Sequence, residues 1–126
     1  MADPGLALHK AIYTALQSIS VPTYDSVPRN ASYPYVTLDT TATDNADLLS
    51  ERVDFTFVYL AIWSEQRGQE QVLSIMGEIN DLLHEQPLTL DNGTVVSVRV
   101  ERKSTQRDAD NETFMGSMTL RVIVKH

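Results

Sequence analysis

The segment Asp108–Glu112 holds residue types that could bind a metal ion, because carboxylate and amide side chains follow one another as at the start of a calcium loop. Such a loop needs glycine at its sixth position and a bidentate glutamate at its twelfth. These positions here are Thr113 and Thr119. The segment is therefore predicted to be a solvated loop, and no metal site is expected.

The candidate nucleophiles lack the partners that catalysis would need. Ser117 follows a glycine, but the second glycine of a nucleophile elbow is missing and the serine lies within a predicted strand. The chain has no cysteine, which excludes disulfides, thiolate nucleophiles and zinc–thiolate sites. The histidines, His9, His84 and His126, lie far apart in the sequence and are expected at the surface or at helix ends. The sequence thus predicts neither catalytic residues nor a cofactor.

Length and composition point to a single globular domain. The chain has 126 residues, of which 42% are hydrophobic, and this is enough for one core but not for two. Its formal charge of −7 argues against a primary nucleic-acid binder, which needs a concentrated positive surface. The sequence contains no run of about 18 apolar residues and no signal-peptide pattern. We therefore expect it to be made and to fold in a cytoplasm, without a membrane contact.

Two helices are predicted from apolar residues that recur at helical spacing. The first is expected over residues 4–21, capped by Asp3 and closed by Pro22. The second is expected over Ser64–Glu85, with the serine as its cap. Its apolar stripe consists of Val72, Ile75, Met76, Ile79, Leu82 and Leu83. Gly77 costs this helix about 1 kcal/mol relative to alanine, so it predicts a close approach by a neighbouring element.

The remaining apolar segments are predicted to be strands. They are Tyr35–Thr40, Glu51–Trp63, a hairpin of Leu88–Leu90 and Thr94–Arg102, and Thr113–Lys125. Because these strands follow one another directly, the sheet should be mainly antiparallel with both helices packed on one face, which is an α+β fold in a two-layer sandwich. In the second strand the four aromatic residues share one face and are expected to be mostly core, with a contact between subunits as the alternative. They are Phe55, Phe57, Tyr59 and Trp63.

Two polar segments, Thr41–Ser50 and Lys103–Glu112, are predicted to be loops. Both are long for hairpin connections, which typically have about 2–5 residues. We expect them to be mobile in the free subunit and to become ordered against a partner. Plain solvent-exposed linkage is the alternative, because surface loops are mobile by default.

Several short segments follow one another in a characteristic order along the chain. They are LALHKAIYTAL, TYDSVP, YPYVTL, a long strand that closes on IWSE, a helix introduced by Gly68, LTLDNGTVVSVRVE, RDADNET and FMGSMTLRVIV. Taken together, these segments resemble the tail-completion, or tail-terminator, family of long-tailed phages and related gene-transfer particles. The resemblance covers nearly the whole chain, and its specificity lies in the order and spacing of many weak motifs.

The resemblance implies a structural protein of the virion that forms a homo-oligomeric ring, commonly of six subunits, at the head-proximal end of the tail tube. The implied partners are the tail tube protein on one face and a head–tail connector protein on the other, and genome DNA passes through the ring without specific binding. The family implies no catalytic residues, so the protein is not expected to be an enzyme. One alternative is a neck or head-closure ring protein nearer the capsid. The other is a small α+β ligand-binding or enzymatic domain, which would need a pocket with converging polar groups.

Two sets of residues are predicted to make the contacts of such a ring. Val58, Leu60 and Ile62 give the second strand a further apolar face, which a head-to-tail subunit contact would cover. The two loops supply residues that face a partner or the lumen, namely Asp44, Asp47, Arg107, Asp108 and Asp110. Six copies would carry 6 × −7 = −42 charges. Carboxylates repel DNA phosphates within a Debye length of about 8 Å, so Asp44 and Asp47 are the first candidates for a lining along which DNA slides.

Overall fold

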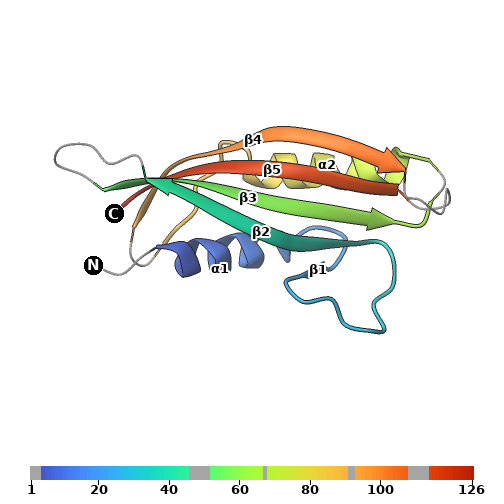
Figure 1. The fold of residues 1–126 in the computed structure, drawn as a ribbon. Coiled ribbons are helices and arrows are strands. Elements are labelled where there is room, and N and C mark those ends of the chain that lie inside the picture. The colour runs from blue at the N-terminus through green and yellow to red at the C-terminus, as the bar shows by residue number, and fades with distance from the viewer. Residues whose placement is uncertain (1–3, 46–51, 67, 91–92, 108–113) are drawn as a thin grey trace.

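The protein is an α+β sandwich of two layers in the computed structural model, which describes residues 4–45, 52–66, 68–90, 93–107 and 114–126 (Figure 1). The elements are α1 (Gly5–Leu16), β1 (Thr23–Tyr24), β2 (Tyr35–Asn45), β3 (Val53–Ser64), α2 (Glu70–Leu83), β4 (Thr94–Arg107) and β5 (Phe114–Lys125). The strands form one sheet in the order β1-β2-β3-β5-β4, in which β1 pairs with β2 in parallel and the other neighbours are antiparallel. Both helices pack on the same face of the sheet, which confirms the predicted fold class.

Helix α1 is shorter than predicted. It begins after Pro4 and ends at Leu16, whereas the sequence suggested an end near Pro22, and the predicted cap Asp3 lies outside the described residues. The Ser18 hydroxyl donates a hydrogen bond to the Ala15 carbonyl at 2.9 Å, and the Ser18 amide donates to the same oxygen. Such local bonds compete with the helical pattern, which explains why the helix stops there.

Strand β2 is longer than predicted, because its second half pairs fully with β3. Asp44 lies opposite Phe55, and the hydroxyl oxygens of Thr43 and Thr56 lie 3.2 Å apart across the two strands. The prediction of a loop over Thr41–Ser50 is therefore wrong for residues 41–45, and the rest of that segment lies outside the described residues. Every residue from position 39 to 45 is exposed, so this part of the strand has no apolar alternation to reveal it.

The two faces of β3 are reversed relative to the prediction. Val58, Leu60 and Ile62 are 3%, 1% and 0% exposed and belong to the core beneath the helices. The aromatic residues project from the opposite, open face of the sheet, where Tyr59 is 39% exposed.

The register with β5 explains this choice of faces. Val58 and Leu60 lie beside Leu120 and Met118, which are apolar, whereas Phe57 and Tyr59 lie beside Arg121 and Thr119. Neighbours in register point to the same side of a sheet. Only the face of Val58 and Leu60 can therefore join an apolar layer that runs across both strands.

Helix α2 begins later than predicted, at Glu70 after Gln69. Ser64 does not cap it. This serine is the last residue of β3, where its buried hydroxyl contacts Gln71 and accepts a hydrogen bond from the Gln66 amide at 3.1 Å. The buried stripe consists of Val72, Ile75, Met76, Ile79 and Leu83, and Leu82 packs partly buried against the core.

The close approach predicted at Gly77 occurs at Gly116 instead. A Cβ atom on Gly116 of β5 would lie 2.6 Å from both Met76 Cε and Val72 Cγ1, whereas a Cβ atom on Gly77 would meet nothing within 4 Å. The glycine that lets α2 pack closely on the sheet is thus in the strand and not in the helix.

The last two strands form a long hairpin. The prediction for β5 is confirmed, with Phe114, Met118, Leu120, Val122 and Val124 buried. Strand β4 continues to Arg107, so the prediction of a loop is wrong for residues 103–107, and residues 108–113 lie outside the described part of the chain. Residues 88–90 do not form the predicted strand, because only a single bridge joins Thr89 to Thr94.

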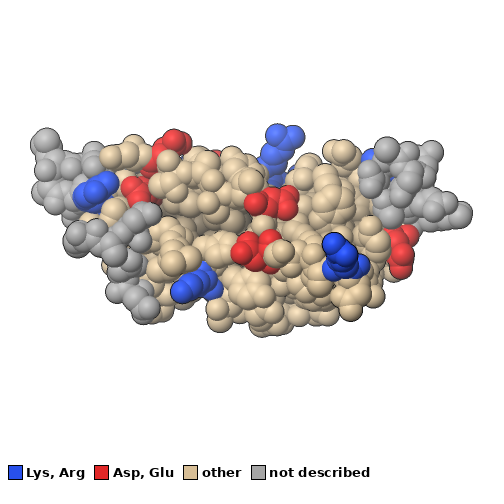
Figure 2. Space-filling view, turned by 60° about the horizontal axis from the view of Figure 1, so that its bottom comes forward, with Lys and Arg blue, Asp and Glu red and all other residues tan. Residues whose placement is uncertain are grey.

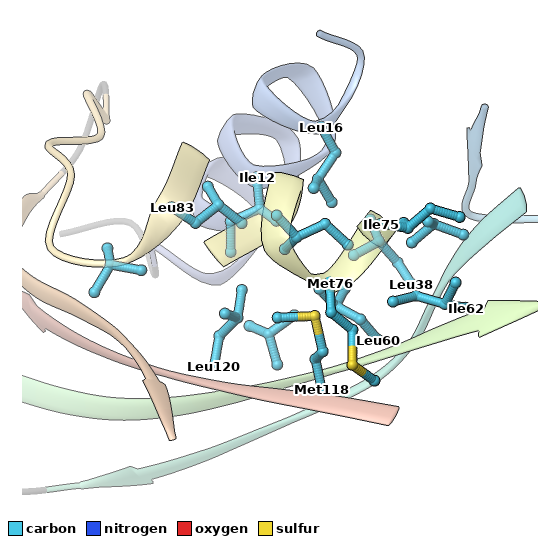
Figure 3. Packing of buried hydrophobic residues seen from close by; sticks show 14 of the residues in the cluster. Ile12, Leu16, Leu38, Leu60, Ile62, Ile75, Met76, Leu83, Met118 and Leu120 are labelled. Carbon is cyan, nitrogen blue, oxygen red and sulfur yellow. The ribbon is translucent and has the colours of Figure 1, made fainter. Parts of the chain in front are cut away.

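The core lies between the two layers. Leucine, isoleucine and methionine side chains from α1 and α2 meet those of β2, β3 and β5, including Ile12, Leu16, Met76, Leu60 and Met118 (Figure 3). All of these are at most 2% exposed. The helices thereby cover one face of the sheet except at the second half of β2 and the end of β4, and no helix among the described residues covers the opposite face.

Candidate functional site

The open face of the sheet carries a stripe of aromatic side chains along β3. Phe55, Phe57, Tyr59 and Trp63 occupy alternate positions of the strand, and all but Tyr59 are partly buried by their neighbours. Trp63 donates a hydrogen bond from Nε1 to the Thr37 hydroxyl at 3.2 Å, which holds the indole against the sheet. The stripe is therefore an ordered apolar surface.

Three tyrosines extend this surface at one end of the sheet. Tyr35 lies opposite Trp63, and its ring centroid is 5.4 Å from that of Tyr33 and 5.8 Å from that of Tyr24. Burial raises the pKa of the Tyr35 phenol above its ordinary value of 10.0, and the neighbouring Tyr33 raises it further. Tyr35 thus remains neutral at physiological pH and serves as a packing group.

Basic residues gather beside the aromatic stripe on β4 and β5. Arg99 lies opposite Arg121, and Arg102 lies opposite Thr119, so all three start from the open face. Like charges directly opposite one another are unfavourable. Nearby acids reduce this repulsion: Arg121 Nη1 lies 3.8 Å from Glu101 Oε1, and Arg99 Nη1 lies 3.4 Å from Glu85 Oε1. The open face is thus aromatic at its centre and basic along one side.

The structure does not support the predicted subunit interface at Val58, Leu60 and Ile62. All three are buried by helices of the same chain, so they are not available for a contact between subunits. The error follows from the reversed faces of β3. The face of this strand that is free to meet another molecule is the aromatic one.

The residues predicted to face a partner or a lumen are only partly described. Asp44 is exposed on β2, opposite Phe55. Arg107 ends β4, and its guanidinium carbon lies 5.2 Å from the centre of the Phe114 ring. Asp47, Asp108 and Asp110 lie outside the described residues.

Each histidine interacts with a neighbouring group of the fold. His9 Nε2 lies 3.5 Å from Asp25 Oδ2, and His84 Nδ1 accepts a hydrogen bond from the Val100 amide at 2.9 Å. His84 follows the last residue of α2, as predicted for a histidine at a helix end. His126 differs from the prediction of a surface residue, because its side chain is 5% exposed and its Nε2 lies 3.0 Å from Asp54 Oδ2.

Among the residues that the structure describes, no group of three or more His, Cys, Asp or Glu side chains could hold a metal ion. The same part of the chain has no helix long and apolar enough to cross a membrane. Figure 2 shows one face of the molecule, on which acidic and basic residues are scattered among uncharged ones without forming a broad patch of one sign.

Comparison with known proteins identifies a family and a solved structure that this chain resembles. Residues 7–125 match the family described as "Tail completion protein gp17". A solved structure described as "Virion of native gene transfer agent (GTA) particle" contains a chain of the same fold, with a TM-score of 0.90, 19% sequence identity and 100% of both chains covered. No curated protein gives a significant sequence match.

Proposed function

Because the chain belongs to the tail completion protein gp17 family, we propose that it forms a ring that ends the tail tube and joins it to the head-side connector. Membership of this family makes the chain a structural protein of a phage-type tail. The ring, its place at the head-proximal end of the tube and its partners are the proposal. The observation that carries it is the extent of the match, which includes every helix and strand except the first two residues of α1.

The surfaces of the subunit suit a protein that works by contact. A non-obligate interface is typically enriched in aromatic residues, methionine and arginine at its centre. The open face of the sheet has this composition, with four aromatic residues on β3 and Arg99, Arg102 and Arg121 beside them. A closed ring of identical subunits requires such a surface on every copy, together with a second surface that receives it.

The ring would have to let the genome pass without holding it. The chain has a net charge of −7, so an assembled ring would be strongly acidic. Nucleic-acid binding requires concentrated positive charge, and an acidic lumen would instead repel phosphate at close range. Asp44 is exposed on β2 and is a candidate for this lining.

Deletion of the gene tests the proposal directly. If the protein ends the tube, particles made without it should show separate full heads and tubes of irregular, excessive length, because nothing stops tube growth. Purified wild-type protein added to such a lysate should restore joined particles. Tails of normal length that fail to join heads would indicate the alternative neck or head-closure role, and normal joined particles would refute both.

A further inference from the structure

A hollow on the side of the molecule lies between α2 and the edge strand β4. It has a volume of about 240 Å³ and is lined by Leu73, Met76, Gly77, Lys103, Ser104 and Thr105. Leu73 is 52% exposed at its rim, which is unusual for a leucine in a helix whose other face is fully buried. The hollow is thus apolar on the side of α2 and polar on the side of β4, where Lys103, Ser104 and Thr105 line it.

None of the residues that the structure describes accounts for the glycine in this hollow. Gly77 is exposed in the middle of α2, and a Cβ atom there would meet no atom within 4 Å. A glycine in a helix interior is unfavourable relative to alanine, and in this helix no internal contact offsets the loss. A glycine at this position would be explained if another molecule packed closely against the helix backbone there.

We propose that the hollow receives Tyr59 from the open sheet face of a second copy of this chain. This contact rests on the proposed ring and specifies how its subunits meet. Tyr59 is the most exposed residue of the aromatic stripe, at 39%, and lies at the centre of the sheet. A cavity of about 150 Å³ can take a benzene ring, so the hollow has room for a phenol.

The charges around the two surfaces favour this pairing. The exposed side of α2 carries Glu70 and Asp81, and the hollow itself is lined by one basic residue, Lys103 of β4. Tyr59 is accompanied on the open face by Arg102 and Arg121, which can reach the carboxylates of α2 when Tyr59 enters from the helix side. Docking one copy's open face on the next copy's α2 would therefore place arginines near carboxylates. Docking two open faces together would instead bring the arginines of both copies close to one another. Charge complementarity of this kind selects the head-to-tail arrangement.

The positions of the surfaces also suit a ring. Opposite parallel surfaces would stack copies into a filament, whereas surfaces inclined to each other allow a head-to-tail contact to close. The hollow lies at the edge of the sheet, because its lining comes from α2 and the edge strand β4, whereas Tyr59 lies on the central strand β3. The two surfaces of one subunit are therefore offset from each other across the sheet.

Cross-linking in assembled particles tests the contact, and the absence of cysteine from the chain makes it specific. Thr40 lies beside Tyr59 on the open face, and Ser74 lies beside Leu73 on α2, with both exposed. The double variant Thr40→Cys, Ser74→Cys, treated with a short bismaleimide, should give linked species of two, three and more copies. Each single variant should give none, and the pair Gln17→Cys, Ser74→Cys serves as a matched control with both positions in the helical layer.

Two results would overturn the contact while leaving the proposed function intact. One is the absence of linked species in particles that have incorporated the double variant, and the other is dimer formation by Thr40→Cys alone, which would mean that two open faces pack together. If particles do not incorporate even the unmodified chain, the proposed function itself is wrong and the contact falls with it.

Substitutions provide a second readout. Gly77→Phe fills the hollow and Tyr59→Ala removes the inserted side chain, so each should raise the concentration needed for self-assembly by at least about tenfold, as for a central aromatic anchor. The control Leu6→Ala truncates an exposed side chain of α1 and should leave assembly unchanged. Circular dichroism of the variants separates loss of assembly from loss of folding. Folded Gly77→Phe and Tyr59→Ala variants that assemble like wild type would contradict the proposal.

Discussion

Substituting alanine at Gly116 and at Gly77 should change stability in opposite directions. Neither glycine has a positive φ, so alanine is compatible with both backbones and would stabilise through the unfolded chain by about 0.4–1 kcal/mol. At Gly116 the new methyl group would lie 2.6 Å from Val72 Cγ1 and Met76 Cε. The methionine end can move, but the valine is fixed on a buried helix face. Overpacking of this kind costs about 1–3 kcal/mol.

The net expectation for Gly116→Ala is therefore a loss of about 1–2 kcal/mol in the free energy of unfolding. Gly77→Ala meets no atom within 4 Å and should instead gain about 1 kcal/mol from helix propensity. Urea unfolding of the isolated subunit measures both, provided that the m-value stays the same. Val72→Ala should relieve part of the Gly116→Ala loss, so a double-mutant cycle should show coupling. An unchanged or more stable Gly116→Ala variant would refute the packing described for α2 and β5.

The remaining predictions concern the two faces of the sheet, the tyrosine cluster and the lumen. Leu60→Ala should lower the free energy of unfolding by about 2–5 kcal/mol, whereas Leu73→Ala in the isolated subunit should change it by no more than about 0.5 kcal/mol; equal losses would contradict the assignment of faces. Tyr35 has a raised pKa in the folded protein, so its contribution to stability is present below pH 10 and is lost as the pH rises through the folded pKa. Tyr35→Phe should therefore flatten the alkaline part of the stability profile, and an unchanged slope would argue against burial as the cause. Replacing both Asp44 and Asp47 with lysine should slow genome ejection while tail length stays normal, and ejection at the wild-type rate would show that these residues do not line the channel.

The sequence predicted the buried face of an element correctly where its apolar pattern allows only one interpretation. Strand β5 alternates between polar and apolar residues from Ser117 to Val122, so both its existence and its buried face were predictable. The second half of strand β3 is apolar on both faces, and its sequence alone cannot decide which set of residues points to the helices. That choice depends on its register with β5, which is a property of the assembled sheet.

Other features leave almost no trace in the sequence. The second half of β2 and the end of β4 consist of polar, mostly exposed residues that read as loops, yet they pair along the sheet. Strand β1 has only two residues, Thr23 and Tyr24. The open face could not be identified as the candidate site until the faces of β3 were known. The family, by contrast, was predictable, because it depends on the order of many segments and not on the orientation of one strand.

The place of the protein in the particle is the central claim, and electron cryo-microscopy of the head–tail junction tests it most directly. We expect a closed ring between the tail tube and the head-side connector, with each subunit fitted by the five-stranded sheet and its two helices. In that ring the open sheet face of each copy should meet α2 of the next. Density for this fold at the distal end of the tail, or no density for it at the junction, would show that the protein does not form the proposed ring.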